Sequence, residues 1–106
     1  MKEMLLSKAE ERYQALYTAV ANYQDKALEK SLKETELSAK RHHLLASGVI
    51  DGKNAEIREG QLHEYLEEDY AALHLLEEEL QVCYSAKVLA DILVNEVTTL
   101  VKILSL

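Results

Sequence analysis

The sequence contains no proline, tryptophan or phenylalanine, and only three of its 106 residues are glycine. Proline and glycine are the usual interrupters of regular structure, so their scarcity favours long continuous helices. A single cysteine, Cys83, excludes an internal disulfide framework and fits a reducing, cytoplasmic location. We expect it to be a small core residue. No apolar run has the signal-peptide pattern or reaches the roughly 18 residues of a membrane span.

Leucine, alanine, glutamate and lysine dominate what is present, which is typical of long helices and coiled coils. At 106 residues we expect one domain. The net charge of −7 argues against nucleic acid as a partner. This charge is uneven, because residues 1–50 carry 8 basic and 7 acidic side chains while residues 51–106 carry 4 and 12.

The midpoint of the chain carries the signals of a helix end followed by a new start. Gly48 can take the left-handed conformation that ends a helix. Asp51-Gly52 is a turn dipeptide, and Asp51 or Asn54 is a candidate N-cap for the next helix. The sequence therefore predicts an all-α helical hairpin, with a first arm at 3–47, a hinge at 48–53 and a second arm at 54–105.

The same stretch, Gly48-Val49-Ile50-Asp51-Gly52-Lys53-Asn54-Ala55-Glu56-Ile57-Arg58-Glu59 followed by Gln61-Leu62, resembles a segment of small, mostly uncharacterised helical proteins of bacteriophages and prophages. The shared pattern is G-x-I-x-G-K-N-x-x-x-R-E-x-Q-L. Gly60 stands where that pattern has alanine. The resemblance implies a phage or mobile-element origin and implies no catalytic residue.

The first arm has a seam of apolar residues at alternating spacings of three and four, which is the pattern of a coiled coil. The seam fails at Lys30 and Glu34. Either the helix is continuous or kinked, or it breaks near Ser31. We favour the continuous or kinked helix, because no glycine or proline marks a stop. The predicted seam residues are Leu6, Ala9, Tyr13, Leu16, Val20, Tyr23 and Ala27.

The lysines of the first arm lie on one ridge and face the acidic second arm if the two arms run antiparallel. Simple hairpin geometry places Lys33 near Glu67 or Glu68, and Lys26 near Glu77 or Glu78. Ion pairing between the arms is then the main interpretation, although an exposed ridge could instead contact a ligand. The candidate partner or ligand surface comprises Tyr13, Tyr17, Lys26, Lys30, Glu67, Glu68, Glu77 and Glu78.

The second arm begins with an apolar stripe formed by Leu62, Leu66, Leu73, Leu76, Leu80 and Cys83. From Ala86 onward, apolar side chains spread over most of the helix circumference. Such a helix must be buried on nearly all sides, and one partner arm cannot achieve this. We therefore expect a homo-oligomer, with a dimer forming a four-helix bundle as the smallest closed solution and higher even orders as alternatives. The predicted self-association residues are Leu89, Ile92, Leu93, Val97, Leu100, Val101 and Leu104.

The sequence contains neither a di-iron motif nor an activated cysteine. The di-iron bundle motif needs Glu-x-x-His, and no histidine here has a carboxylate three residues earlier. Cys83 has no base or basic residue beside it in sequence. We expect no enzyme activity, metal or cofactor.

The function we expect is that of a helical interaction or adaptor protein that binds another macromolecule, most simply a protein, and has no membrane contact. The alternative is a phage anti-defence factor that inhibits a host defence complex or sequesters a nucleotide between subunits. In that alternative the nucleotide base stacks on tyrosine, with Lys26 or Lys30 near its phosphate.

Overall fold

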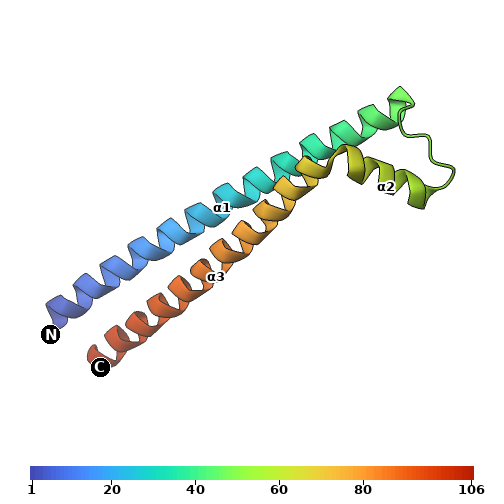
Figure 1. The fold of residues 1–106 in the computed structure, drawn as a ribbon. Helices are drawn as coiled ribbons and strands as arrows, with labels where there is room; N and C mark the ends of the chain where they lie inside the picture. The colour runs from blue at the N-terminus through green and yellow to red at the C-terminus, as the bar shows by residue number, and fades with distance from the viewer. The chain divides into compact units, whose positions relative to one another are not determined.

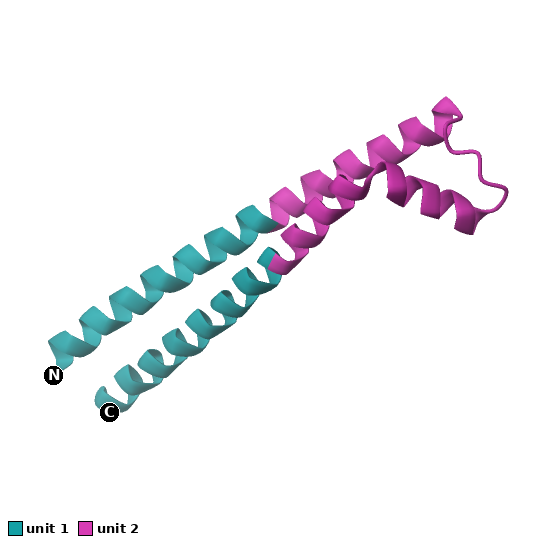
Figure 2. Ribbon diagram, viewed as in Figure 1, with its two compact units in different colours: residues 1–26, 79–106 teal, residues 27–78 magenta.

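The computed structural model describes residues 1–106 and contains three helices and no strand. They are α1 (Lys2–Ser47), α2 (Ala55–Tyr65) and α3 (Glu67–Leu104), drawn in Figure 1. Helix α1 is continuous, so the alternative of a break near Ser31 is wrong. Two compact units share these helices, residues 1–26 with 79–106 (unit 1) and residues 27–78 (unit 2), as coloured in Figure 2.

The end of α1 follows the predicted cap. Gly48 has φ +81°, a left-handed backbone that is strained for residues with a Cβ atom. Ile50 is buried just beyond it. The N-cap of α2 is Asn54, whose Oδ1 accepts a hydrogen bond from the Ile57 amide at 2.9 Å. Of the two candidate N-caps, Asn54 is thus confirmed and Asp51 is wrong.

Asp51 and Gly52 instead fix the hinge against α2. Asp51 Oδ1 accepts a hydrogen bond from Gln61 Nε2 at 2.8 Å, while the Gly52 amide donates to Gln61 Oε1 at 2.9 Å. A Cβ atom at Gly52 would lie 2.7 Å from Cγ2 of Ile57. The hinge is therefore a closely packed loop that requires glycine at this position.

The second arm is not the single helix that the sequence predicts, because it breaks at Leu66. This residue has φ −112° and ψ 25°, outside helical values. Its amide still donates to Leu62 O at 3.0 Å and its carbonyl accepts from the Tyr70 amide at 2.9 Å. The break therefore keeps backbone hydrogen bonds on both sides, and α3 starts at once with Glu67, Glu68 and Asp69, whose carboxylates suit a helix N-terminus.

In unit 1, α1 and α3 meet along a seam at alternating spacings of three and four. Val97 is fully buried in this seam, and Ala90 and Val94 are buried beside it. On the α1 side, Leu5 and Arg12 occupy places that the sequence analysis assigned to Leu6 and Tyr13, which are exposed. The predicted seam was wrong by one residue at these two positions, because it accepted only apolar residues and Arg12 holds one of the places.

In unit 2, α1 and the start of α3 meet at charged residues. Lys30 and Lys33 are half-buried on α1, as is Asp69 on α3, and Leu37 is buried beyond them. The apolar pattern therefore appeared to fail at Lys30 because a lysine occupies this seam position. Leu62 and Leu66 complete the small core, together with Ile50 from the hinge.

Candidate interaction surfaces

The α3 helix of unit 1 carries a second apolar stripe beside its seam. Its positions follow spacings of three and four, so they lie along one flank of the helix. Leu89 is 57% exposed, and Leu93 is half-buried at the inner edge of the stripe. In order, the flank is Glu79, Val82, Ala86, Leu89, Leu93, Glu96, Leu100 and Ile103.

The α1 helix of unit 1 has a flank of a different character. Its middle holds only short side chains, Ala15, Ala19 and Asn22, at the same alternating spacing. We call these three residues the short row. Basic residues precede and follow them, so the flank in order is Lys8, Arg12, Ala15, Ala19, Asn22 and Lys26. This flank is therefore shallow in its middle and positively charged toward its ends.

Two ion pairs place the two flanks on the same face of unit 1. Arg12 Nη1 lies 3.3 Å from Glu96 Oε1 and donates to the Leu93 carbonyl at 2.9 Å. Lys26 Nζ lies 2.6 Å from Glu79 Oε2. Near the chain termini, a groove of about 550 Å³ has a lining that includes Lys8 of the α1 flank and both Leu100 and Ile103 of the α3 flank. We call this surface, from the short row of α1 to the exposed leucines of the α3 flank, the apolar face.

The other side of unit 1 carries exposed tyrosines of α1 next to the exposed Leu6. Tyr13 lies about 100° round α1 from Arg12, and its hydroxyl is 3.3 Å from Thr98 Oγ1. Tyr17 is 72% exposed. Tyr23 is already engaged, with its ring 6.0 Å from that of Tyr84 and 4.9 Å from the Lys87 ammonium.

Unit 2 has a charged centre on Asp69. Its Oδ1 accepts hydrogen bonds from both Lys33 Nζ and Lys40 Nζ at 2.8 Å, while Glu36 lies 3.5 Å from Lys33 and 3.1 Å from Lys40. The hydrogen bond from Lys33, followed by that from Lys40, lowers the pKa of Asp69. The hydrogen bond to Asp69 in turn raises the pKa of both lysines. These groups are charged at neutral pH and hold α1 to the start of α3.

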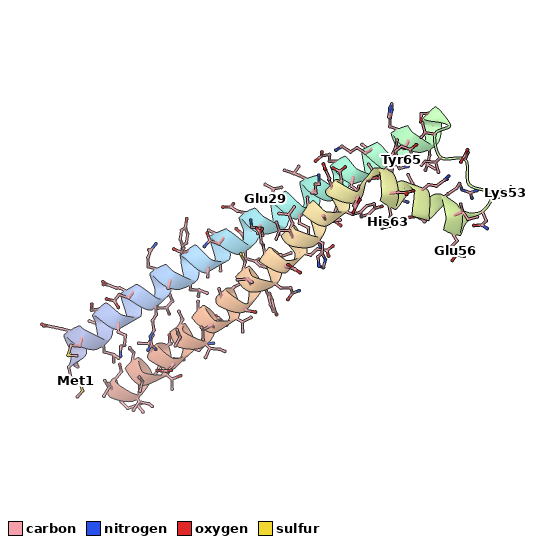
Figure 3. All side chains as sticks on the ribbon, viewed as in Figure 1. Met1, Glu29, Lys53, Glu56, His63 and Tyr65 are labelled. Atoms are coloured by element: carbon pink, nitrogen blue, oxygen red, sulfur yellow. The ribbon has the colours of Figure 1, made fainter.

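A second polar cluster in unit 2 joins all three helices. Arg41 forms an ion pair with Glu59 of α2 and donates to the Tyr70 hydroxyl of α3 at 2.5 Å. The hydrogen bond from Arg41 lowers the pKa of Glu59. His63, which projects from α2 in Figure 3, stacks on the Tyr70 ring with centroids 3.9 Å apart and planes 10° from parallel. Arg41 of α1 therefore contacts the helices on both sides of the break at Leu66 and stabilises their arrangement.

The predicted self-association residues fall into two groups. Leu89, Ile92, Leu100 and Leu104 are exposed. Val97 is fully buried, and Leu93 and Val101 are half-buried. Val97 is a correction, because in a single chain it packs against α1 and is not available to a second copy.

The candidate partner surface is also divided, since Tyr13, Tyr17 and Lys26 belong to unit 1 while the remaining residues belong to unit 2. The inter-arm pairing of the lysines is confirmed with each acidic partner shifted by one residue, to Asp69 for Lys33 and to Glu79 for Lys26. The prediction assumed a uniform hairpin, and this geometry did not include the break at Leu66. The exposed members in unit 2 are Glu67, Glu68, Glu77 and Glu78, whereas Lys30 is half-buried.

The histidines do not gather with other metal ligands. His74 lies 3.0 Å from Glu78 and 3.9 Å from Glu77 on one helix face, and His63 lies 3.9 Å from Glu59. No group of three or more histidine, cysteine, aspartate or glutamate residues is arranged to hold a metal ion. None of the three helices combines the length and apolar character that crossing a membrane requires.

No protein-family model, curated protein or solved structure matches this chain. The geometry of the two units therefore carries the functional argument. Sequence analysis missed the short row of α1. Its signal was available, because Ala15, Ala19 and Asn22 continue the spacing of Lys8 and Arg12, but small residues are too common in helices to draw attention alone.

Proposed function

We propose that this protein is a non-enzymatic helical interaction protein that assembles through the apolar face of unit 1 and binds another macromolecule through unit 2. The observation that carries the proposal is the set of exposed large apolar side chains on one flank of α3, which are Val82, Leu89, Leu100 and Ile103. Large contiguous apolar patches on soluble proteins mark interaction sites. Assembly removes these side chains from water.

The exposed carboxylates of α3 in unit 2 supply the second surface. Glu67 and Glu68 lie in the first turn of the helix, while Glu77 and Glu78 lie beside His74. All four are exposed. Complementary charge steers association and favours the correct partner. We therefore assign a protein with a basic surface as the partner of unit 2.

The assembly test measures molar mass by light scattering after size exclusion, starting from a chain of 12.0 kDa. We expect a dimer or a larger even oligomer. Leu89→Glu should weaken association by about 100-fold or more, because each interface loses buried leucines and gains desolvated charge. The matched control is Val88→Glu, since Val88 lies on the outer side of α3, away from α1 and from the apolar face. A wild-type chain that stays a helical monomer at high micromolar concentration contradicts the proposal.

The partner test compares proteins captured by the wild type and by the double variant Glu67→Gln/Glu68→Gln. The control is Glu34→Gln, which removes an exposed charge from α1 of the same unit. We expect a partner that the double variant loses and the control retains. Identical capture by all three proteins rules out the acidic end of α3 as the binding surface.

The nucleotide alternative depends on Tyr13 and Tyr17, which are exposed and available for stacking. Lys26, the nearest phosphate candidate in unit 1, is already paired with Glu79. Calorimetry with nucleoside mono- and triphosphates tests this alternative, and Tyr17→Ala should abolish any binding that involves base stacking. Absence of heat with every nucleotide removes it.

A further inference from the structure

The surface area of the chain is large enough to supply a dimer interface. The chain exposes 7909 Å². A folded monomer of its 12.0 kDa mass is expected to expose about 6,000 Å². The excess of about 1,900 Å² per chain exceeds the roughly 800 Å² per partner of a standard interface and reaches the range of obligate dimers. A second copy of the chain could therefore bury an area of this size.

The shapes of the two flanks indicate which helices meet. The α1 flank has only the short row in its middle, between Arg12 and Lys26. On α3 the same stretch runs from Glu79 to Glu96, because these carboxylates pair with the two basic residues. Leu89 lies within that stretch, level with the short row. Interiors pack to crystal-like density, so large residues are best accommodated by small ones across an interface. The short row of one copy therefore fits the leucines of another.

The charges of the flanks support the same match independently. Within its row of alternating spacing, the α1 flank carries Lys8, Arg12 and Lys26 and no carboxylate. The α3 flank carries Glu79 and Glu96 and no basic residue. Contact of α1 with α1 from the second copy would bring cations together and set one short row against the other. Contact of α1 with α3 brings opposite charges together at both ends of the short row.

Resting on the proposed assembly, we infer that the apolar face binds a second copy of this chain through a two-fold axis parallel to the helices, so that α1 of each copy packs on α3 of the other. This arrangement makes every pair of neighbouring helices in unit 1 antiparallel, as in an up-down four-helix bundle. It also places the chain termini of both copies at the same end. A two-fold axis perpendicular to the helices would pair α1 with α1 and put the termini at opposite ends.

Spin-label distances separate the two arrangements. The labels are placed singly by Lys102→Cys or Val88→Cys in a Cys83→Ala background, and distances are measured by double electron–electron resonance. Val88 lies level with the short row, so its two labels stay close in either arrangement. Lys102 lies near the chain end, so its two labels are within about 30 Å for parallel hairpins, given helix spacings of 8–10 Å. Antiparallel hairpins separate them by at least about 40 Å at 1.5 Å per residue.

We expect a short distance from both positions. A short distance at Val88 with a long distance at Lys102 overturns the parallel two-fold axis and leaves the assembly intact. No distance at either position, together with a monomeric mass in light scattering, overturns the assembly itself. Leu89→Glu should remove the signal at both positions, which shows that the measured pairs form through the apolar face.

Discussion

Unit 2 and unit 1 are built from the same two long helices, yet they bury their seams by different means. In unit 2 the hinge and α2 fold onto α1 and the start of α3, so that Ile50, Leu62 and Leu66 are buried together. In unit 1 only two helices meet, and the buried residues are the smaller Ala90, Val94 and Val97. Two helices can cover the seam between them but not their flanks.

The polar contacts are also more extensive in unit 2 than in unit 1. Unit 2 has directed clusters around Asp69 and Arg41 that join its helices in one arrangement. The two inter-helix ion pairs of unit 1, Arg12–Glu96 and Lys26–Glu79, lie toward the ends of a largely apolar face. Unit 2 thus buries its core within one chain, and this difference supports the proposal that a second chain covers unit 1. Changes in unit 2 should act on stability independently of protein concentration.

The largest effect within unit 2 is expected from Leu62→Ala. Leu62 is 1% exposed, and truncating a buried leucine to alanine costs about 2–5 kcal/mol through lost burial and the cavity left behind. Urea unfolding followed by circular dichroism at two protein concentrations gives the free energy of unfolding. The cost should be the same at both concentrations. Leu75→Ala is the control, because Leu75 is exposed in the same unit and its truncation should change stability by less than about 0.5 kcal/mol. Equal costs for the two variants would contradict the core described for unit 2.

Local signals predicted the helix ends well. The Gly48 cap and the Asn54 N-cap each depend on residues within a few positions, so the sequence contains all of their determinants. The all-α class and the continuous α1 follow from composition and from the absence of proline. The apolar character of residues 86–104 also pointed to the face that is exposed in unit 1.

The phase of the seam and the break at Leu66 were not predicted, for a physical reason. Arg12, Lys30 and Lys33 occupy seam positions because acidic residues of α3 face Arg12 and Lys33, and that pairing depends on contacts distant in sequence. A search for apolar periodicity alone therefore shifts to neighbouring residues such as Tyr13. The run Glu67-Glu68-Asp69 is a usable sign of a new helix start, but the sequence analysis placed Glu67 and Glu68 on the partner surface of one continuous second arm.

A smaller effect is expected from Asp69→Asn, which tests whether charge holds unit 2 together. Asp69 and Lys33 are half-buried and linked by a charge-assisted hydrogen bond, so the variant should lose about 1–2 kcal/mol at neutral pH. Because folding lowers the pKa of Asp69, its contribution is present above the ordinary aspartate value near 4 and is lost as pH falls through the lower folded value. Wild-type stability should therefore drop below about pH 4, and the variant should show less of this drop.

Chemical denaturation from pH 7 to pH 2.5 measures both quantities. Asp91→Asn serves as the control, because Asp91 is exposed in unit 1 and lies outside the clusters described above. An Asp69→Asn variant with wild-type stability at neutral pH would show that the lysine contacts are replaced by water at no cost. Unit 2 would then depend on its apolar core alone.

The smallest effects come from two glycines of unit 2, and they should have opposite signs. Gly48 has φ +81°, so Gly48→Ala places a Cβ atom in a left-handed conformation and should destabilise the protein by about 1 kcal/mol, although no atom obstructs it. Gly60 lies inside α2 with equally open space. Gly60→Ala should stabilise the protein by about 1 kcal/mol, because alanine is the better helix former.

Thermal unfolding of both variants at two protein concentrations checks the signs. Neither residue lies in unit 1, so the molar mass of the assembly should be unchanged in both. Two changes of the same sign would mean that the conformation of Gly48 is not the feature that ends α1. A change in molar mass would mean that the hinge influences assembly, and the two units could not then be treated as independent of each other.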